Sequence, residues 1–375
     1  MSRIRPYIGG VGVLAIVALS ATLVSAAQQE QRTAPGGRSG REVFETTCIA
    51  CHGPDGRGTA NPVLTKILTL PDFTDCNFAV REPSADWLAV AHNGGPARGF
   101  SPLMPPWGTL YTADELERAV EHLRTFCADD SWPRGELNLP RPLVTGKAFP
   151  EDEVVVSTSS STRGDGEVVS KFIYERRLGA LNQVEVSIPL SSTQSATGGW
   201  ATGVGDIALG YKRTITHDVN RGNIFSVSAE VALPVGSERR GLGKGFAIFE
   251  PFVTYGQLIG SESFVQVQGG FEIPARQDED SEAFWRAAVG RSFREGRFGR
   301  TWSPMFELLA ARPFASGAII NWDVVPQVQI TLNARQHIRV NGGIRLPVNN
   351  RTDRSPSVIF YFLWDWFDGG LLDGW

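Results

Sequence analysis

Apolar and polar residues alternate one by one through most of the second half of the chain. The segments NQVEVSIPL (182–190), FSVSAEVAL (225–233) and SVIFYFLWDW (357–366) are clear examples. Successive side chains of a β-strand point to opposite faces, so this period of two predicts strands with one apolar and one polar face. The 41 glycines and 21 phenylalanines fit a β-rich fold with many turns.

About twelve such segments follow one another, and most are 10 to 14 residues long. They lie near residues 153–161, 168–178, 181–191, 204–216, 223–235, 246–259, 262–274, 283–293, 301–312, 321–332, 335–347 and 355–367. Strands of this length are long for a soluble sheet and suit tilted strands that cross a bilayer.

The connections between these segments alternate in length. The short ones include GAL, SES and NAR, and the long ones include SSTQSATGGWATG, GSERRGLGKG and VNNRTDRSP. Outer-membrane barrels separate periplasmic turns from external loops in this way. The polar row also carries charges at strand centres, which suits a water-containing lumen: Lys212, Glu230, Arg339 and Arg345.

Residues 153–375 are therefore predicted to form an antiparallel transmembrane β-barrel of about 12 strands. A soluble β-sandwich remains the alternative, because alternation alone does not say whether the apolar row faces lipid or a core. The chain ends in an aromatic-rich strand and Trp375, which is similar to the C-terminal signal of outer-membrane proteins, with Phe367 as an alternative strand end.

The N-terminus has the pattern of a secretory signal peptide over residues 1–26. Arg3 and Arg5 precede an apolar run, Val11 to Val24, and small residues precede a cleavage site between Ala26 and Ala27. An uncleaved anchor is the alternative. Export would place the four cysteines in an oxidising compartment.

The sequence CIACH, residues 48–52, places two thiols and an imidazole within five positions. A thioredoxin-like site would not need the histidine, and Cys76 and Cys127 are too scattered to complete a zinc knuckle. In an exported chain, C-x-x-C-H indicates covalent attachment of a c-type haem. Cys48 and Cys51 are the candidate attachment points, and His52 is the candidate proximal ligand.

The surroundings of this motif resemble a class I c-type cytochrome over residues 38–130. GREVF (40–44) precedes the motif as an amphipathic turn, and the glycine-rich GPDGRG (53–58) follows it. TADELERAVEHLRTFC (112–127) predicts a helix with a capping box at Thr112 and Glu115. The resemblance implies a small all-α domain with one covalent haem c.

In that family the second iron ligand is a methionine in a loop before the last helix. Met104 lies in such a loop, GFSPLMPPWG (99–108), and two prolines follow it. His92 is the competing candidate, although it is also placed to cap a short helix. Cys76 and Cys127 predict a disulfide, with two buried free thiols as the alternative.

Residues 131–152 predict a proline-rich linker between the two domains. The net charge of −4 gives no indication of a nucleic-acid partner. GVGDIALGYKR (203–213) resembles a strand entry in transporter-like barrels associated with phenol degradation.

The whole plan resembles the monohaem porin–cytochrome fusions of iron-oxidising bacteria. It implies an electron carrier in the outer membrane, with the cytochrome in the periplasm. Its partners would be periplasmic redox proteins, membrane lipid, and a small-molecule or metal-ion electron donor. A porin-like transporter of small aromatic compounds, whose cytochrome serves an associated oxidation, is the alternative. The residues favour a carrier over an enzyme, while the resemblance leaves Fe(II) oxidation open.

Overall fold

The computed structural model describes residues 37–162, 166–194, 199–352 and 354–375. The predicted signal peptide lies outside these residues. Within them, no helix has the length and apolar character needed to cross a lipid bilayer.

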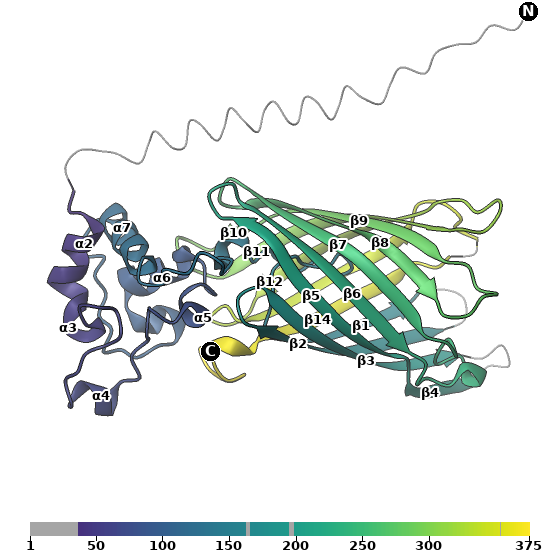
Figure 1. Ribbon diagram of the computed structural model, residues 1–375, viewed down its shortest axis with the longest axis horizontal. Helices are drawn as coiled ribbons and strands as arrows, with labels where there is room; N and C mark the ends of the chain where they lie inside the picture. The colour runs from purple at the N-terminus through teal and green to yellow at the C-terminus, as the bar shows by residue number, and fades with distance from the viewer. Residues whose placement is uncertain (1–36, 163–165, 195–198, 353) are drawn as a thin grey trace, which may run out of the picture. The chain divides into compact units, whose positions relative to one another are not determined.

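The first domain is a small group of short helices (Figure 1). Its helical elements are α2 (Gly40–Val43), η2 (Phe44–Cys48), α3 (Ile49–His52), α4 (Leu64–Ile67), α5 (Cys76–Ala79), α6 (Ser84–Asn93), η3 (Gly95–Arg98) and α7 (Ala113–Arg124). Elements α2, η2 and α3 follow without a break, so one helical segment with a π-helical centre runs from Gly40 to His52.

The packing of α2 against α7 explains two sequence features. The predicted capping box is present, because the Thr112 hydroxyl accepts from the Glu115 amide while the Glu115 carboxylate accepts from the Thr112 amide. At Gly40 an added Cβ would lie 1.9 Å from the backbone oxygen of Arg118, so only glycine permits this approach. The core between the helices contains Val43 and Leu116.

The second domain is a β-barrel closed by twelve strands (Figure 1). These strands are β1 (Glu153–Ser161), β2 (Glu167–Leu178), β3 (Asn182–Gln194), β5 (Ile207–Asp218), β6 (Asn223–Leu233), β7 (Ile248–Ile259), β8 (Ser263–Pro274), β9 (Glu282–Arg291), β11 (Thr301–Pro313), β12 (Asn321–Thr331), β13 (Ile338–Pro347) and β14 (Ser357–Asp365). Each of the twelve pairs antiparallel with the strands before and after it in this order, and β1 pairs with β14 to close the barrel. Strand β9 pairs directly with β11, although the short β10 lies between them in the sequence. Closure leaves none of the twelve with an unpaired edge.

Shorter elements lie in the connections. They are β4 (Trp200–Val204), β10 (Phe293–Arg294), η4 (Gly135–Leu137), η5 (Glu238–Arg240) and η6 (Trp366–Asp368). The sequence analysis did not predict β4 or β10 as separate strands. The last strand was predicted to extend to Phe367, whereas β14 ends at Asp365 and η6 begins at Trp366.

The two faces of the wall differ as the alternation predicts. Leu209 and Val289 keep 46% and 48% of their surface exposed on the outer face, whereas Ser226 and Gln266 are buried on the inner face. An outer face made of exposed large apolar side chains is what a lipid environment requires. The antiparallel barrel of about 12 strands is confirmed.

Because β1 begins where β14 ends, both flanks of the barrel leave from one end, which we name the entry end; the opposite end is the far end. Successive antiparallel strands then alternate between the two ends. The connection 179–181 lies at the entry end, and 348–356 lies at the far end.

Six glutamates form a cross-strand row on the inner wall. Glu175 pairs with Glu185, Glu230 pairs with Glu250, and Glu272 pairs with Glu282. On β5, Gly210 pairs with Glu185 of β3 on one side and with Glu230 of β6 on the other. The neighbouring residue pairs of β7 and β8 place Glu250 opposite Glu272. The row starts near the entry end on β2 and reaches the far end at the first residue of β9, because barrel strands are tilted.

Two consecutive residues of β5 test the inner and outer faces. Leu209→Arg should impair barrel assembly, because a charge in the lipid-facing band costs about 2 to 4 kcal/mol at the bilayer midplane. Gly210→Arg should assemble like the wild type, because its side chain would enter the lumen between Glu185 and Glu230. The measurement is the fraction of barrel that migrates faster on gels unheated than boiled. Equal loss of that fraction in both variants would contradict the assignment of faces.

Candidate functional site

The C-x-x-C-H motif closes the first helical segment of the chain. Cys48 ends η2, while Cys51 and His52 lie on α3, so the three side chains occupy adjacent helical positions. Both thiols are free and half-buried. Burial raises the pKa of the Cys48 thiol to about 11, and the neighbouring Cys51 adds to this shift. Two thiols one helical turn apart suit thioether bonds to the same edge of a porphyrin.

The imidazole of His52 lies in an apolar environment. Its ring centroid is 5.1 Å from that of Phe73, and Phe73 lies at the same distance from Trp87. Burial lowers the pKa of His52, which favours the neutral form that a metal ligand needs. Its Nδ1 atom is buried without a hydrogen-bond partner among the described residues. This unsatisfied nitrogen fits a side chain that is completed by a bound group.

The glycine-rich turn after the motif folds back onto it. The Gly58 amide donates to the His52 carbonyl over 2.9 Å, and the Thr59 amide donates to the Cys51 carbonyl over 2.8 Å. Gly53 and Gly58 have φ values of 71° and 88°, which few other residues adopt without strain. The turn therefore fixes the chain direction directly after His52.

Large apolar side chains are exposed near α4 and in the segment around the predicted second ligand, Met104. Val63 directly precedes α4 and Ile67 ends it, whereas Leu103 and Leu110 lie in the segment around Met104. All four keep more than half of their surface exposed. A haem has two broad apolar faces, so these side chains, the free thiols and the neutral imidazole together fit a covalent haem.

Met104 is held by its backbone in the loop between η3 and α7. Its carbonyl accepts from the Gly95 amide over 2.9 Å, and its amide donates to the Ser101 carbonyl over 3.1 Å. His92, the competing candidate, has its ring next to other groups. Its Nδ1 lies 2.7 Å from the Asn93 side-chain oxygen, and its ring centroid lies 5.4 Å from that of Phe298.

Cys76 and Cys127 form a disulfide. It joins the start of α5 to the segment after α7 and closes a loop with a sequence separation of 51, which includes Met104. Closing a loop of this length stabilises the fold by roughly 4 kcal/mol in the chain-entropy model. The predicted pairing is present, and the alternative of two free thiols is not.

The linker before β1 lies inside the barrel. Residues 138–152, which we call the plug, have no regular secondary structure, yet Leu139, Lys147 and Phe149 are buried. The side-chain amide of Asn138 donates to the Glu151 carboxylate over 3.2 Å, so the two ends of the plug meet and the segment is a closed loop. Side chains, backbone amides and carbonyls of the plug form hydrogen bonds with partners on ten of the twelve strands: β1, β2, β3, β5, β6, β8, β11, β12, β13 and β14.

Lumen-facing glutamines satisfy the plug backbone. Amides of the plug donate to four of them, and a fifth donates to the Pro140 carbonyl: Gln183, Gln268, Gln327 and Gln329 accept, and Gln266 donates. Glu307 is fully buried and accepts from the amides of Val144 and Thr145 over 3.1 and 2.6 Å. The plug is therefore bound to the wall by hydrogen bonds along its length.

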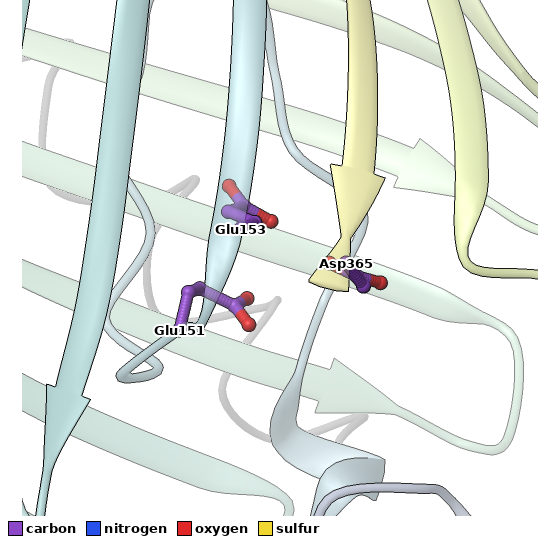
Figure 2. Close-up of side chains that lie close together, drawn as sticks. All are labelled: Glu151, Glu153 and Asp365. Carbon is purple, nitrogen blue, oxygen red and sulfur yellow. The ribbon is translucent and has the colours of Figure 1, made fainter. Parts of the chain in front are cut away.

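Three carboxylates converge where the plug meets β1 and β14: Glu151, Glu153 and Asp365 (Figure 2). One oxygen from each lies within 4.8 Å of the others, and all three side chains are buried. Three cations oppose them. Lys147 pairs with Glu151, Arg141 pairs with Glu153, and Arg339 lies 2.6 Å from Asp365. Arg141 also pairs with Glu175 on β2, so the cluster ties the plug to the barrel as an ion network.

Residues 35–123 match the family model described as "Cytochrome C oxidase, cbb3-type, subunit III". The matched range contains the whole C-x-x-C-H motif and Met104. The first domain is a cytochrome c domain. This family carries haem c, so the match agrees with the chemistry of the thiols and of His52.

Solved structures similar to the chain include porins and an outer membrane channel. The NanC porin has a TM-score of 0.41 at 10% identity, over 57% of this chain and 98% of the porin. An outer membrane channel from Pseudomonas putida F1 has a TM-score of 0.43 at 13% identity, over 60% of this chain and 99% of the channel. The KdgM porin has a TM-score of 0.38 at 5% identity, over 56% and 98%. No curated protein matches the chain.

Residues 131–152 were predicted as a linker, and their position in the lumen was not predicted. One available signal was the pair of glutamines at alternate positions on two strands, Gln266 with Gln268 and Gln327 with Gln329. Uncharged amides at inward positions are suited to bind a peptide backbone, because each both donates and accepts.

Covalent attachment predicts a result on denatured protein. Haem absorbance should remain with the wild-type polypeptide after acid–acetone extraction, because thioether bonds to Cys48 and Cys51 resist it. The double variant Cys48→Ser, Cys51→Ser should lose the absorbance. The double variant Cys76→Ser, Cys127→Ser is the matched control and should retain it. Haem that is extracted from the wild type would contradict the assignment.

Proposed function

We propose that this protein carries single electrons through one covalent haem c, in a cytochrome domain that the barrel fixes in the outer membrane. The observation that carries the proposal is the pairing of a cytochrome c domain with a barrel whose lumen contains the plug. A barrel bound to its own linker on ten strands suits an anchor better than an open solute channel.

The residues available to hold the haem have separate tasks. Cys48 and Cys51 would attach it, and His52 and Met104 would be its two iron ligands. A haem with these ligands supplies reversible one-electron transfer, and a His/Met pair leaves no iron position open for oxygen. The buried Phe73 beside His52, with the half-buried Trp87 behind it, would keep water away and favour a high reduction potential.

The topology supports a periplasmic cytochrome domain. An even number of strands returns the chain to the entry end, so β1 starts and β14 finishes there. In bacterial outer-membrane barrels the short turns face the periplasm, and the tight connections 179–181 and 260–262 are at the entry end. The cytochrome domain precedes β1 and would therefore lie in the periplasm.

The proposed electron partners are periplasmic redox proteins on one side and an external donor or acceptor, including a metal ion, on the other. The second candidate function, a porin-like transporter of small compounds, requires the plug to leave the lumen. The hydrogen bonds to Glu307 and to the glutamines oppose this movement.

Ligation by Met104 predicts a spectroscopic result. The oxidised protein should show a weak near-infrared charge-transfer band from sulfur to iron at neutral pH. Met104→Ala should remove the band, while Met305→Leu, in the barrel core, should keep it. A band that survives in Met104→Ala would contradict the assignment, and a wild type without any band would make His92 the better candidate.

The plug predicts low conductance. The full-length protein in planar bilayers should show almost no stable ion current. Glu307→Ala leaves two plug amides without their acceptor, which destabilises the bound plug by about 1 to 3 kcal/mol for each amide. The variant should therefore spend more time in conducting states. Glu262→Ala, which changes an exposed pair with Arg291, is the control and should behave like the wild type. A steady wild-type current equal to that of Glu307→Ala would favour the porin-like function.

A further inference from the structure

The loop that carries Met104 is closed on η3. The Gly95 amide donates to the Met104 carbonyl, and the Phe100 amide donates to the Gly95 carbonyl, both over 2.9 Å. A Cβ at Gly95 would lie 2.1 Å from the Ser101 carbonyl oxygen, so the two sides of the loop are in direct contact. The position of Met104 therefore depends on the position of η3.

A buried ion pair fixes η3 to α6. Arg98 ends η3, and its guanidinium donates to Asp86 over 3.0 and 2.7 Å. Arg98 also donates over 2.7 Å to the carbonyl of Phe298, in the barrel connection that follows β10. Arg98 is 3% exposed and Asp86 is 8% exposed, so water contributes little to their solvation. A buried pair of this kind is held strongly only while its hydrogen-bond partners remain in place.

The connection between β12 and β13, residues 332–337, contacts the same segment from the barrel side. Arg335 donates to the carbonyls of Arg98 and Gly99 over 3.3 and 2.8 Å, and its guanidinium lies 4.5 Å from the ring centroid of Phe100. Gln336 donates to Asp86 over 3.3 Å. We name these contacts of Arg335 and Gln336 the latch.

The backbone of Gln336 is in an unusual conformation. Its φ is 64°, in the left-handed region that a residue with a side chain occupies at a cost. The side chain is almost buried, and it also accepts from the Thr301 hydroxyl over 3.0 Å. A glycine would fit this backbone better, but it would lack the side-chain contact to Asp86.

We propose that the latch positions Met104 for iron ligation, so that the barrel sets the strength of the second iron ligand in the cytochrome domain. The inference rests on the proposed ligation by Met104 and adds a role for Arg335 and Gln336, which touch neither the motif nor Met104 directly. They act through Asp86, Arg98 and η3.

Loss of the latch should weaken ligation without unfolding either domain. The Met104 loop would keep its internal hydrogen bonds, but η3 would keep only the Arg98 contact with the Phe298 carbonyl as its hydrogen bond to the barrel connections. Removing a hydrogen bond to a charged acceptor changes an equilibrium by about tenfold. At high pH, a protein group that has lost one proton can displace Met104 from the iron. A tenfold weaker bond between Met104 and the iron then lowers the pH midpoint of this displacement by about one unit.

The experiment compares two glycine substitutions in the full-length, haem-loaded protein in detergent. Gln336→Gly removes the contact to Asp86 while relieving the left-handed backbone. Asn350→Gly is the matched control, because Asn350 has a φ of 51° and lies in the connection 348–356 at the far end. The measurements are the pH midpoint at which the sulfur-to-iron band disappears and the reduction potential. Heat-dependent gel mobility verifies that both barrels are folded.

We expect Gln336→Gly to lose the band about one pH unit lower than the wild type and to have a lower reduction potential, with Asn350→Gly unchanged. Arg335→Ala should give a change in the same direction. Unchanged midpoints in both latch variants, or an equal change in Asn350→Gly, would overturn the latch. A wild type that lacks the band would instead overturn the ligation by Met104.

Discussion

A loop without regular secondary structure can occupy the lumen of a barrel only if the wall supplies hydrogen bonds to its backbone. Buried amides and carbonyls without partners would cost more than the plug could recover from burying its few apolar side chains. The wall meets this requirement with glutamines on β3, β8 and β12 and with the carboxylate of Glu307. The inner face of the barrel is therefore matched to one particular segment of the same chain.

This match connects the two domains mechanically. The plug begins directly after η4, whose first amide, Gly135, donates to the Val80 carbonyl in the cytochrome domain over 2.6 Å. It finishes at Asp152, which pairs with Arg81 from the segment after α5 and accepts from the Arg177 amide on β2. The linker is thus fixed at both ends and along its length. A cytochrome on a flexible tether would instead sample many orientations and lose entropy at each encounter with a partner.

Much of the architecture could be predicted from sequence, because it depends on short-range patterns. The period of two located all twelve barrel strands, most of them to within a few residues, and Thr112 and Glu115 located the start of α7. The plug could not be predicted in this way, since proline-rich segments read alike in solvent and inside a lumen. The contacts of Gln336 and Arg335 with residues 86–99 depend on how distant segments meet, and no local pattern encodes them.

The row of glutamates on the inner wall gives the lumen an electrical character. Like charges directly opposite each other on neighbouring strands repel, and five of the six, all except Glu175, form no ion pair within the described ranges. Lys171, Lys212 and Arg286 offset only part of this charge. Carboxylates crowded in this way bind protons or mobile cations, so the row forms a strip of cation-binding groups that runs from the plug to the far end. Mobile counter-ions will gather along it at low ionic strength, and they will be released as the Debye length falls below the width of the lumen.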